Sequence, residues 1–220
     1  MQKTVVGSYD MLTIAQSVAH ELHANGFRES EISVIASTVA SDGVPDNDSF
    51  SNVATGAVTG GLVGGTAGLV LGMLGLALPG LGPVLAAGPL VAALTGAGAG
   101  AAAGGLVGAL TGEGVPEEHA LYYAEAVRRG GTLVAVRTDE VRADRAAEIM
   151  RAHGGIDIEE RASRWREAGW TGSDTLTPPY TKEEAERERR HYGTHADPLT
   201  GLPSTTDPEG DNRRDSTIRH

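Results

Sequence analysis

Two segments of the chain combine short apolar runs with stretches whose apolar residues recur every three or four positions. The first, residues 4–36, predicts a strand, a helix and a second strand. The second opens with a helix at Pro116 and then repeats the order strand, helix, strand up to residue 158. This order predicts an α+β fold, a ferredoxin-like split βαβ domain with a four-stranded sheet and helices.

Capping and breaking residues mark the ends of these elements. Asp10 stands at the N-cap position of the first helix, and Gly26 stands where a left-handed residue would end it. The run 132–138 predicts a strand, and Asp139 is expected to cap the helix after it. Residues 156–158 alternate in polarity, which predicts the last strand of the sheet.

A stretch with a different pattern separates the two halves. Residues 49–112 carry no charged side chain and hold 18 of the 31 glycines. Many of these glycines recur at every fourth position, and residues four apart share one face of a helix. The two resulting stripes are Gly56, Gly60, Gly64, Gly68 and Gly72, and then Gly96, Gly100, Gly104, Gly108 and Gly112. The turn between the two predicted helices is expected at Pro79, Gly80, Gly82 and Pro83.

A helix this rich in glycine needs a compensating interaction, because each interior glycine costs about 1 kcal/mol relative to alanine. A face without side chains lets two backbones approach closely, and small residues at every fourth position are typical of transmembrane helix interfaces. As a helix, residues 53–78 would span about 39 Å, which exceeds the roughly 30 Å of a hydrocarbon layer. We therefore expect a glycine-zipper α-helical hairpin over 53–112 that inserts in or packs against a membrane. The alternative is a soluble homo-oligomer assembled through these hairpins.

Composition limits the chemistry that the chain can carry. A net charge of −11 argues against a nucleic-acid partner, because phosphate binding needs a clustered positive surface. The absence of cysteine excludes thiolate catalysis and cysteine-based zinc sites. His20 and His23 lack the spacing of a helical zinc motif. We expect no catalytic residue, no metal site and no cofactor, and hence a protein that is not an enzyme.

These patterns divide the chain into four parts. They are a split ferredoxin-like domain at 1–38 plus 115–170, a polar linker at 39–52, the apolar hairpin at 53–112, and a charged, mostly disordered tail at 171–220. Trp165 and Trp170 are expected to pack a short helix back onto the domain. Within the tail, residues 183–190 place acidic side chains before basic ones, which favours one helical piece.

Four segments carry a resemblance to a bacterial family. They are KTVVGSYD, PGLGPVLAAGPL, VPEEHALYYAEAVRRGGTLVAVRT and RWREAGW. Over residues 1–170 the chain resembles the general stress protein 17M-like (YflT-type) family, and its glycine-rich segment is similar to low-temperature-induced proteins. The resemblance implies a non-enzymatic protein of the heat, cold or desiccation response, and it supplies no catalytic residues.

The remaining expectations concern location and partners. The N-terminus shows no basic segment followed by an apolar run, so no secretory signal is expected. The hairpin predicts an inner-membrane protein whose globular domain faces the cytoplasm, with membrane lipid and further copies of the chain as partners. A cytoplasmic location is the alternative. A ligand-binding regulatory domain is a third possibility, because ferredoxin-like folds often bind ligands at sheet edges.

Overall fold

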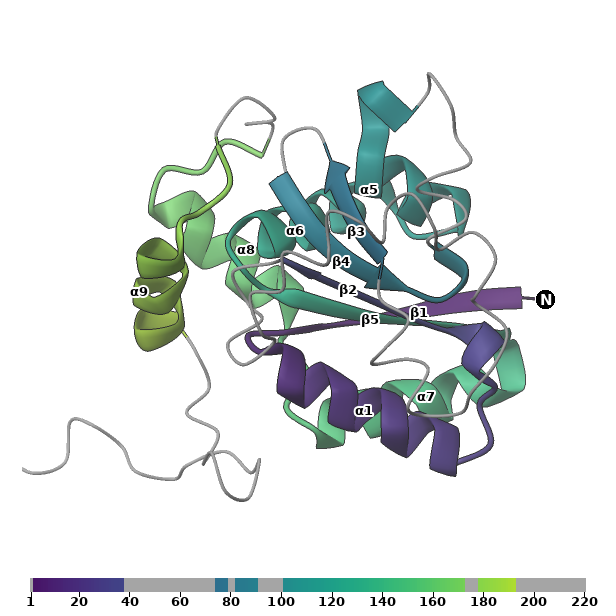
Figure 1. The fold of residues 1–220 in the computed structure, drawn as a ribbon. Helices are drawn as coiled ribbons and strands as arrows, with labels where there is room; N and C mark the ends of the chain where they lie inside the picture. Colours follow the sequence, from purple (N-terminus) through teal and green to yellow (C-terminus); the bar gives the residue numbers. More distant parts are fainter. Residues whose placement is uncertain (1, 38–73, 79–81, 91–100, 173–177, 193–220) are drawn as a thin grey trace, which may run out of the picture.

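A computed structural model describes residues 2–37, 74–78, 82–90, 101–172 and 178–192 of the chain. Its centre is an antiparallel sheet with helices on both faces, so the fold is mixed α+β, as predicted (Figure 1). From one edge to the other, the strands are β1 (Gln2–Tyr9), β5 (Thr132–Asp139), β2 (Ile32–Ser37), β4 (Gly82–Ala87) and β3 (Leu74–Leu78). Every pair of neighbours is antiparallel.

The helices form one layer on each side of this sheet. One layer holds α1 (Leu12–Ala24) and α7 (Glu140–Ala152), and the other holds α5 (Ala101–Gly112) and α6 (Glu117–Arg128). The helix α8 (Ile158–Glu167) packs beside α6, and α9 (Lys182–Tyr192) lies on the outer side of α8. A short 3-10 helix, η1 (Glu29–Glu31), leads into β2.

The interior strand β5 is apolar on both of its faces because helices cover both sides of the sheet. Val134 and Val136 belong to the core beneath α1 and α7. Leu133 and Ala135 alternate with them and belong to the core beneath α5 and α6. Successive side chains of a strand point to opposite faces, so a strand covered twice has a continuous apolar run.

Most of the predicted helix ends are confirmed, and one is wrong. The Asp139 carboxylate accepts a hydrogen bond from the Arg142 amide at 3.0 Å and caps α7. Gly26 ends α1 with a φ of +86°. Asp10 does not cap α1, because the N-cap residue is Met11, which makes no side-chain cap bond. The Asp10 carboxylate instead pairs with Arg161 at 3.2 Å.

The predicted last strand is reduced to a single bridge. Ile156 pairs with Ser8 on the outer edge of β1, and the Ile156 amide donates to the Ser8 carbonyl at 2.9 Å. The Asp157 carboxylate then accepts from the amides of Glu159 and Glu160, which starts α8 at once. The N-cap therefore replaces the strand expected over 156–158.

The prediction of two helices over 53–112 is wrong for residues 74–78 and 82–87, whereas residues 89–90 and α5 are helical. Residues 74–78 and 82–87 are the strands β3 and β4, and Gly82 and Pro83 of the expected turn open β4. Pro79 and Gly80, like residues 53–73 and 91–100, lie outside the described residues. The physical reason is the outer edge of β2, whose backbone groups need partners and obtain them from β4.

No helix in the described part of the chain is long and apolar enough to cross a membrane. The longest described piece of the predicted hairpin that is helical, α5, has 12 residues and a kink at Gly105, where φ is +41°. A helix of this length spans about 18 Å, against roughly 30 Å of hydrocarbon. This finding overturns the predicted transmembrane helix and the predicted inner-membrane location.

Part of the predicted disordered tail is an ordered helix. The expected helical piece at 183–190 falls within α9, and Ala185, its fourth residue, is fully buried. Residues 173–177 and 193–220 lie outside the described residues. Trp165 and Trp170 pack as predicted, with ring centroids 5.9 Å apart in an edge-to-face arrangement.

A glycine after β4 provides a test of how this strand is fixed to the sheet. A Cβ atom on Gly88 would lie 2.1 Å from the Ile32 carbonyl oxygen, and its φ is +93°. We expect Gly88→Ala to lower the free energy of unfolding by about 3 kcal/mol or more, because a backbone clash adds to the left-handed strain. Urea denaturation measures the loss.

Gly114→Ala is the matched control for this substitution. Gly114 has a similar φ of +87°, but a Cβ there would meet no described atom within 4 Å. The free energy of unfolding of this variant should fall only by the cost of left-handed strain, about 1–2 kcal/mol. Equal losses in the two variants would show that the contact with β2 is not tight.

Candidate functional site

The predicted glycine stripes are only partly described, and two of the three described glycines make no close contact with a described atom. Gly104, Gly108 and Gly112 lie in α5. A Cβ atom on Gly108 or Gly112 would meet no described atom within 4 Å. The other seven glycines of the two stripes lie outside the described residues. Close helix packing through the stripes therefore stays a prediction.

The side chains singled out for possible metal binding lie apart from any cluster. His20 and His23 are both exposed on α1, and the His23 ring nitrogen Nδ1 lies 3.2 Å from the Phe27 carbonyl oxygen. Within the described ranges, no three His, Cys, Asp or Glu side chains gather in a way that could hold a metal ion.

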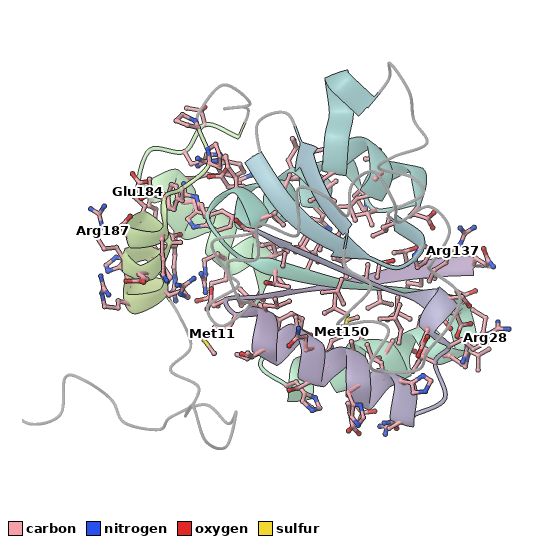
Figure 2. The ribbon with its side chains drawn as sticks, viewed as in Figure 1. Met11, Arg28, Arg137, Met150, Glu184 and Arg187 are labelled. Atoms are coloured by element: carbon pink, nitrogen blue, oxygen red, sulfur yellow. The ribbon has the colours of Figure 1, made fainter. Side chains whose placement is uncertain are left out.

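The structure instead brings several arginines to one end of the sheet, around an open hollow of about 380 Å3. We name it the β5-end hollow. The walls come from the start of β1, from η1, from the end of β5 and from the start of α7. Its lining residues are Gln2, Arg28, Ser30, Glu31, Pro89, Arg137, Thr138, Asp139 and Arg142. Figure 2 shows Arg28 and Arg137 at this end of the molecule, beside the start of β1.

Arg142 is the least exposed of the three arginines that line the hollow and forms its base, and each of its three nitrogens donates to a neighbour. Its Nε donates to Asp139 at 3.2 Å, and its Nη2 donates to Glu31 at 2.7 Å. Its Nη1 donates to the Gly26 carbonyl at 3.3 Å, and the guanidinium lies 4.9 Å from the Phe27 ring centroid. Arg142 therefore ties α7 to the segment between α1 and β2.

Glu31 is the acidic side chain that holds Arg142 at the bottom of the hollow. Its Oε2 accepts from the Arg28 amide at 2.7 Å, and its Oε1 accepts from the Arg28 and Arg142 side chains. Burial alone would raise the pKa of Glu31, but these hydrogen bonds outweigh it and hold the pKa below its ordinary value. The pKa of Asp139 is also lowered, first by the Arg142 amide that it caps.

The rim of the hollow offers hydrogen-bond donors that its acids do not use up. The Arg28 side chain is 77% exposed and makes one bond to a described residue, Glu31. Arg137 is half exposed. Of its five N–H donors, one bonds to Gln2 and one to Glu113 among the described residues. The Thr138 hydroxyl oxygen is buried and has no hydrogen-bond partner among the described residues. Such an orphaned group is uncommon in a folded core.

The chain patterns did not predict this site because its members are far apart in the sequence. Only Asp139 was singled out, as a helix cap. Glu31 and Arg142 are separated by 111 positions, and their pairing depends on the turn before β2 meeting the start of α7. An exposed arginine next to the last apolar residue of β5 was the one available signal, and it is a weak one.

No protein-family model matches this chain, and the comparisons with curated proteins and with solved structures find no match. The resemblance to general stress proteins therefore stays a prediction, and the geometry of the β5-end hollow carries the functional argument.

The lowered pKa of Glu31 predicts a pH dependence of stability. A depressed carboxyl pKa stabilises the fold above its unfolded value of about 4.3, and this stability is lost as the pH falls through the folded pKa. At pH 7, Glu31→Gln should lower the free energy of unfolding by about 1–3 kcal/mol, because it weakens charge-assisted hydrogen bonds. Towards pH 3 the difference from the wild type should shrink.

Urea denaturation between pH 3 and 7 measures this dependence. Glu148→Gln is the control, because Glu148 is 64% exposed and, among the described residues, pairs with Arg145 on the surface. It should change stability by less than about 1 kcal/mol at any of these pH values. A constant gap between wild type and Glu31→Gln across the range would rule out the titration of Glu31 as its cause.

Proposed function

We propose that this chain is a non-catalytic regulatory domain that binds a small anion in the β5-end hollow. The observation that carries the proposal is the pair of rim guanidiniums, Arg28 and Arg137, above a volume of about 380 Å3. Small-molecule sites typically occupy about 300–1,000 Å3. The planar guanidinium fork matches a carboxylate or a phosphate with two parallel hydrogen bonds.

The acids of the hollow do not oppose an incoming anion. Glu31 and Asp139 both accept from Arg142, and Glu31 also accepts from Arg28. Arg142 and Arg28 together balance these two carboxylates, and Arg137 is paired with Glu113. Among the described residues, the anion is therefore offered the remaining N–H donors of Arg28 and Arg137. The unpartnered Thr138 hydroxyl supplies one more polar group to a ligand that enters deeply.

We further propose that the domain is a variant of the ferredoxin-like split βαβ fold. In support, β1 and β2 flank β5 and are both antiparallel to it. The bridge between Ser8 and Ile156 stands on the outer edge of β1, where the fourth strand of that fold would pair. A stress-response role and homo-oligomer formation stay predictions from the sequence.

Removal of one rim arginine tests the anion site. Isothermal titration with inorganic phosphate and with succinate, at low ionic strength, is expected to show binding of at least one anion to the wild type. Arg137→Gln should weaken that binding about tenfold or more, because hydrogen bonds between charged groups contribute about 1.5–3 kcal/mol. The anion that binds more tightly shows whether the site prefers a phosphate or a carboxylate group.

Arg164→Gln is the matched control, since it removes the same charge from a side chain that is equally exposed, at 48%. Arg164 lies on α8 and pairs with Glu160. Its affinity for the anion should equal that of the wild type. An equal loss of affinity in both variants would show that the effect comes from net charge alone. Absence of binding to the wild type would contradict the proposal.

A further inference from the structure

Hydrogen-bonding side chains form almost the whole wall of the β5-end hollow. Eight of its nine lining residues are polar or charged, and Pro89 is the exception. Small-molecule sites are usually lined mostly by apolar and aromatic side chains, with a few polar groups that fix the ligand. No aromatic ring lines the described part of this hollow, so it offers no face for stacking a nucleobase. A ligand that complements it is itself polar over most of its surface.

A hydrogen-bond donor and an acceptor stand side by side in this wall. Gln2 of β1 lies directly opposite Asp139 of β5 in the register of the two strands. Side chains of directly opposite residues lie on the same face of an antiparallel pair. The Gln2 Oε1 accepts from Arg137 Nε at 2.9 Å, whereas the Gln2 amide nitrogen makes no hydrogen bond to a described residue. Gln2 therefore offers its amide N–H groups next to the carboxylate of Asp139.

The Asp139 carboxylate is held in place and still has capacity to accept. Its Oδ1 accepts from the Arg142 amide at 3.0 Å, and its Oδ2 accepts from Arg142 Nε at 3.2 Å. An ionised carboxylate has about four lone-pair sites for hydrogen bonds. The Asp139 side chain is 55% exposed, so a donor in the hollow can reach it. Because the cap and Arg142 fix its orientation, little freedom is lost when a ligand donates to it.

The orphaned hydroxyl of Thr138 is an independent sign that the wall is incomplete without a ligand. Thr138 stands between Arg137 and Asp139 and lines the hollow, yet it is only 3% exposed. Its Oγ1 has no hydrogen-bond partner among the described residues. A threonine hydroxyl donates one hydrogen bond and accepts two, and leaving it unpaired in the core is unfavourable. A second hydroxyl group satisfies it in either role.

We propose that the ligand of the β5-end hollow is a small anion that carries hydroxyl groups, namely a sugar phosphate or a sugar acid. This inference rests on the anion site proposed for Arg28 and Arg137. A hydroxyl group both donates and accepts, so it pairs with Asp139 and Gln2 together while the charged end of the ligand meets the rim arginines. A fully ionised anion without hydroxyl groups has no proton to donate to Asp139.

Matched pairs of ligands test the role of the hydroxyl groups in the full chain. Glycerol 3-phosphate and n-propyl phosphate have the same charge and the same carbon chain, and differ in their hydroxyl groups. Isothermal titration at low ionic strength should show that glycerol 3-phosphate binds at least about tenfold more tightly, because only it donates to the Asp139 carboxylate. Glycerate and propionate form the equivalent pair for a carboxylate ligand, and the pair that binds more tightly distinguishes a sugar phosphate from a sugar acid.

Asp139→Asn identifies the acceptor. Asparagine caps a helix about as well as aspartate, so α7 keeps its N-cap. The affinity ratio of glycerol 3-phosphate to n-propyl phosphate should fall at least about threefold, because a charge-assisted hydrogen bond becomes a neutral one. The ratio is the readout, since the lost negative charge changes the affinity of both esters alike. Asp144→Asn is the matched control, because Asp144 is an exposed residue of α7 outside the hollow, and its ratio should equal that of the wild type.

Gln2→Leu provides a second route that leaves the α7 cap untouched. It removes the amide donor beside Asp139 from an exposed side chain, and the same affinity ratio should fall. Equal affinities within both ligand pairs would overturn this inference but leave the anion site intact. An unchanged ratio in both Asp139→Asn and Gln2→Leu would overturn it as well. Failure of every anion to bind, inorganic phosphate and succinate included, would instead contradict the proposed function itself.

Discussion

The antiparallel pairing of β5 with both β1 and β2 is the constraint on which the rest of the molecule depends. It places β5 between the two helix layers, and it brings the two ends of β5 to two separate surfaces. Arg137 and Asp139 at one end line the β5-end hollow. Gly130 and Gly131, just before the strand begins, line a small cavity beside Glu188 of α9. Both hollows therefore lie at the ends of the same interior strand.

Arginine is the common element of these two surfaces, although the chain as a whole is acidic. At the hollow Arg142 is engaged by Glu31 and Asp139, and beside α9 Arg128 is engaged by Glu125. Next to Arg128, Arg129 donates to the same Glu125 carboxylate, whereas Arg28 and Arg137 at the hollow are more exposed, at 77% and 48%. Taking charges out of water is expensive unless they are paired and hydrogen-bonded, so the engaged arginines and their acids are the structural part of each surface. In the proposed anion site, Arg28 and Arg137 are the side chains that the ligand meets.

The glycine-rich segment shows how an unpaired strand edge overrides a local pattern. Spacing of four favours a helix with one smooth face, but each glycine in a helix interior costs about 1 kcal/mol relative to alanine. In the described residues, β2 has β5 on one side and β4 on the other, and β3 pairs with β4 in turn. Hydrogen bonds along these ladders satisfy the backbone without requiring side chains. The close approach of Gly88 to the Ile32 carbonyl fits a residue without a Cβ atom.

The sequence by itself determined the features that depend on neighbouring residues: the apolar run of β5, the apolar faces of α1 and α7, the cap at Asp139 and the break at Gly26. These are short-range effects of backbone geometry and helix capping, and they can be read from periodicity and spacing. Only the tertiary structure decided the strand identity of 74–78 and 82–87, the docking of α9, and the meeting of Glu31 with Arg142. Each of these depends on which surface or strand edge is left uncovered after the core has assembled, and the residues concerned lie tens to more than a hundred positions apart. Local pattern carries no information about such pairings, because their free energy comes from contacts that exist only once β1, β5 and β2 lie side by side.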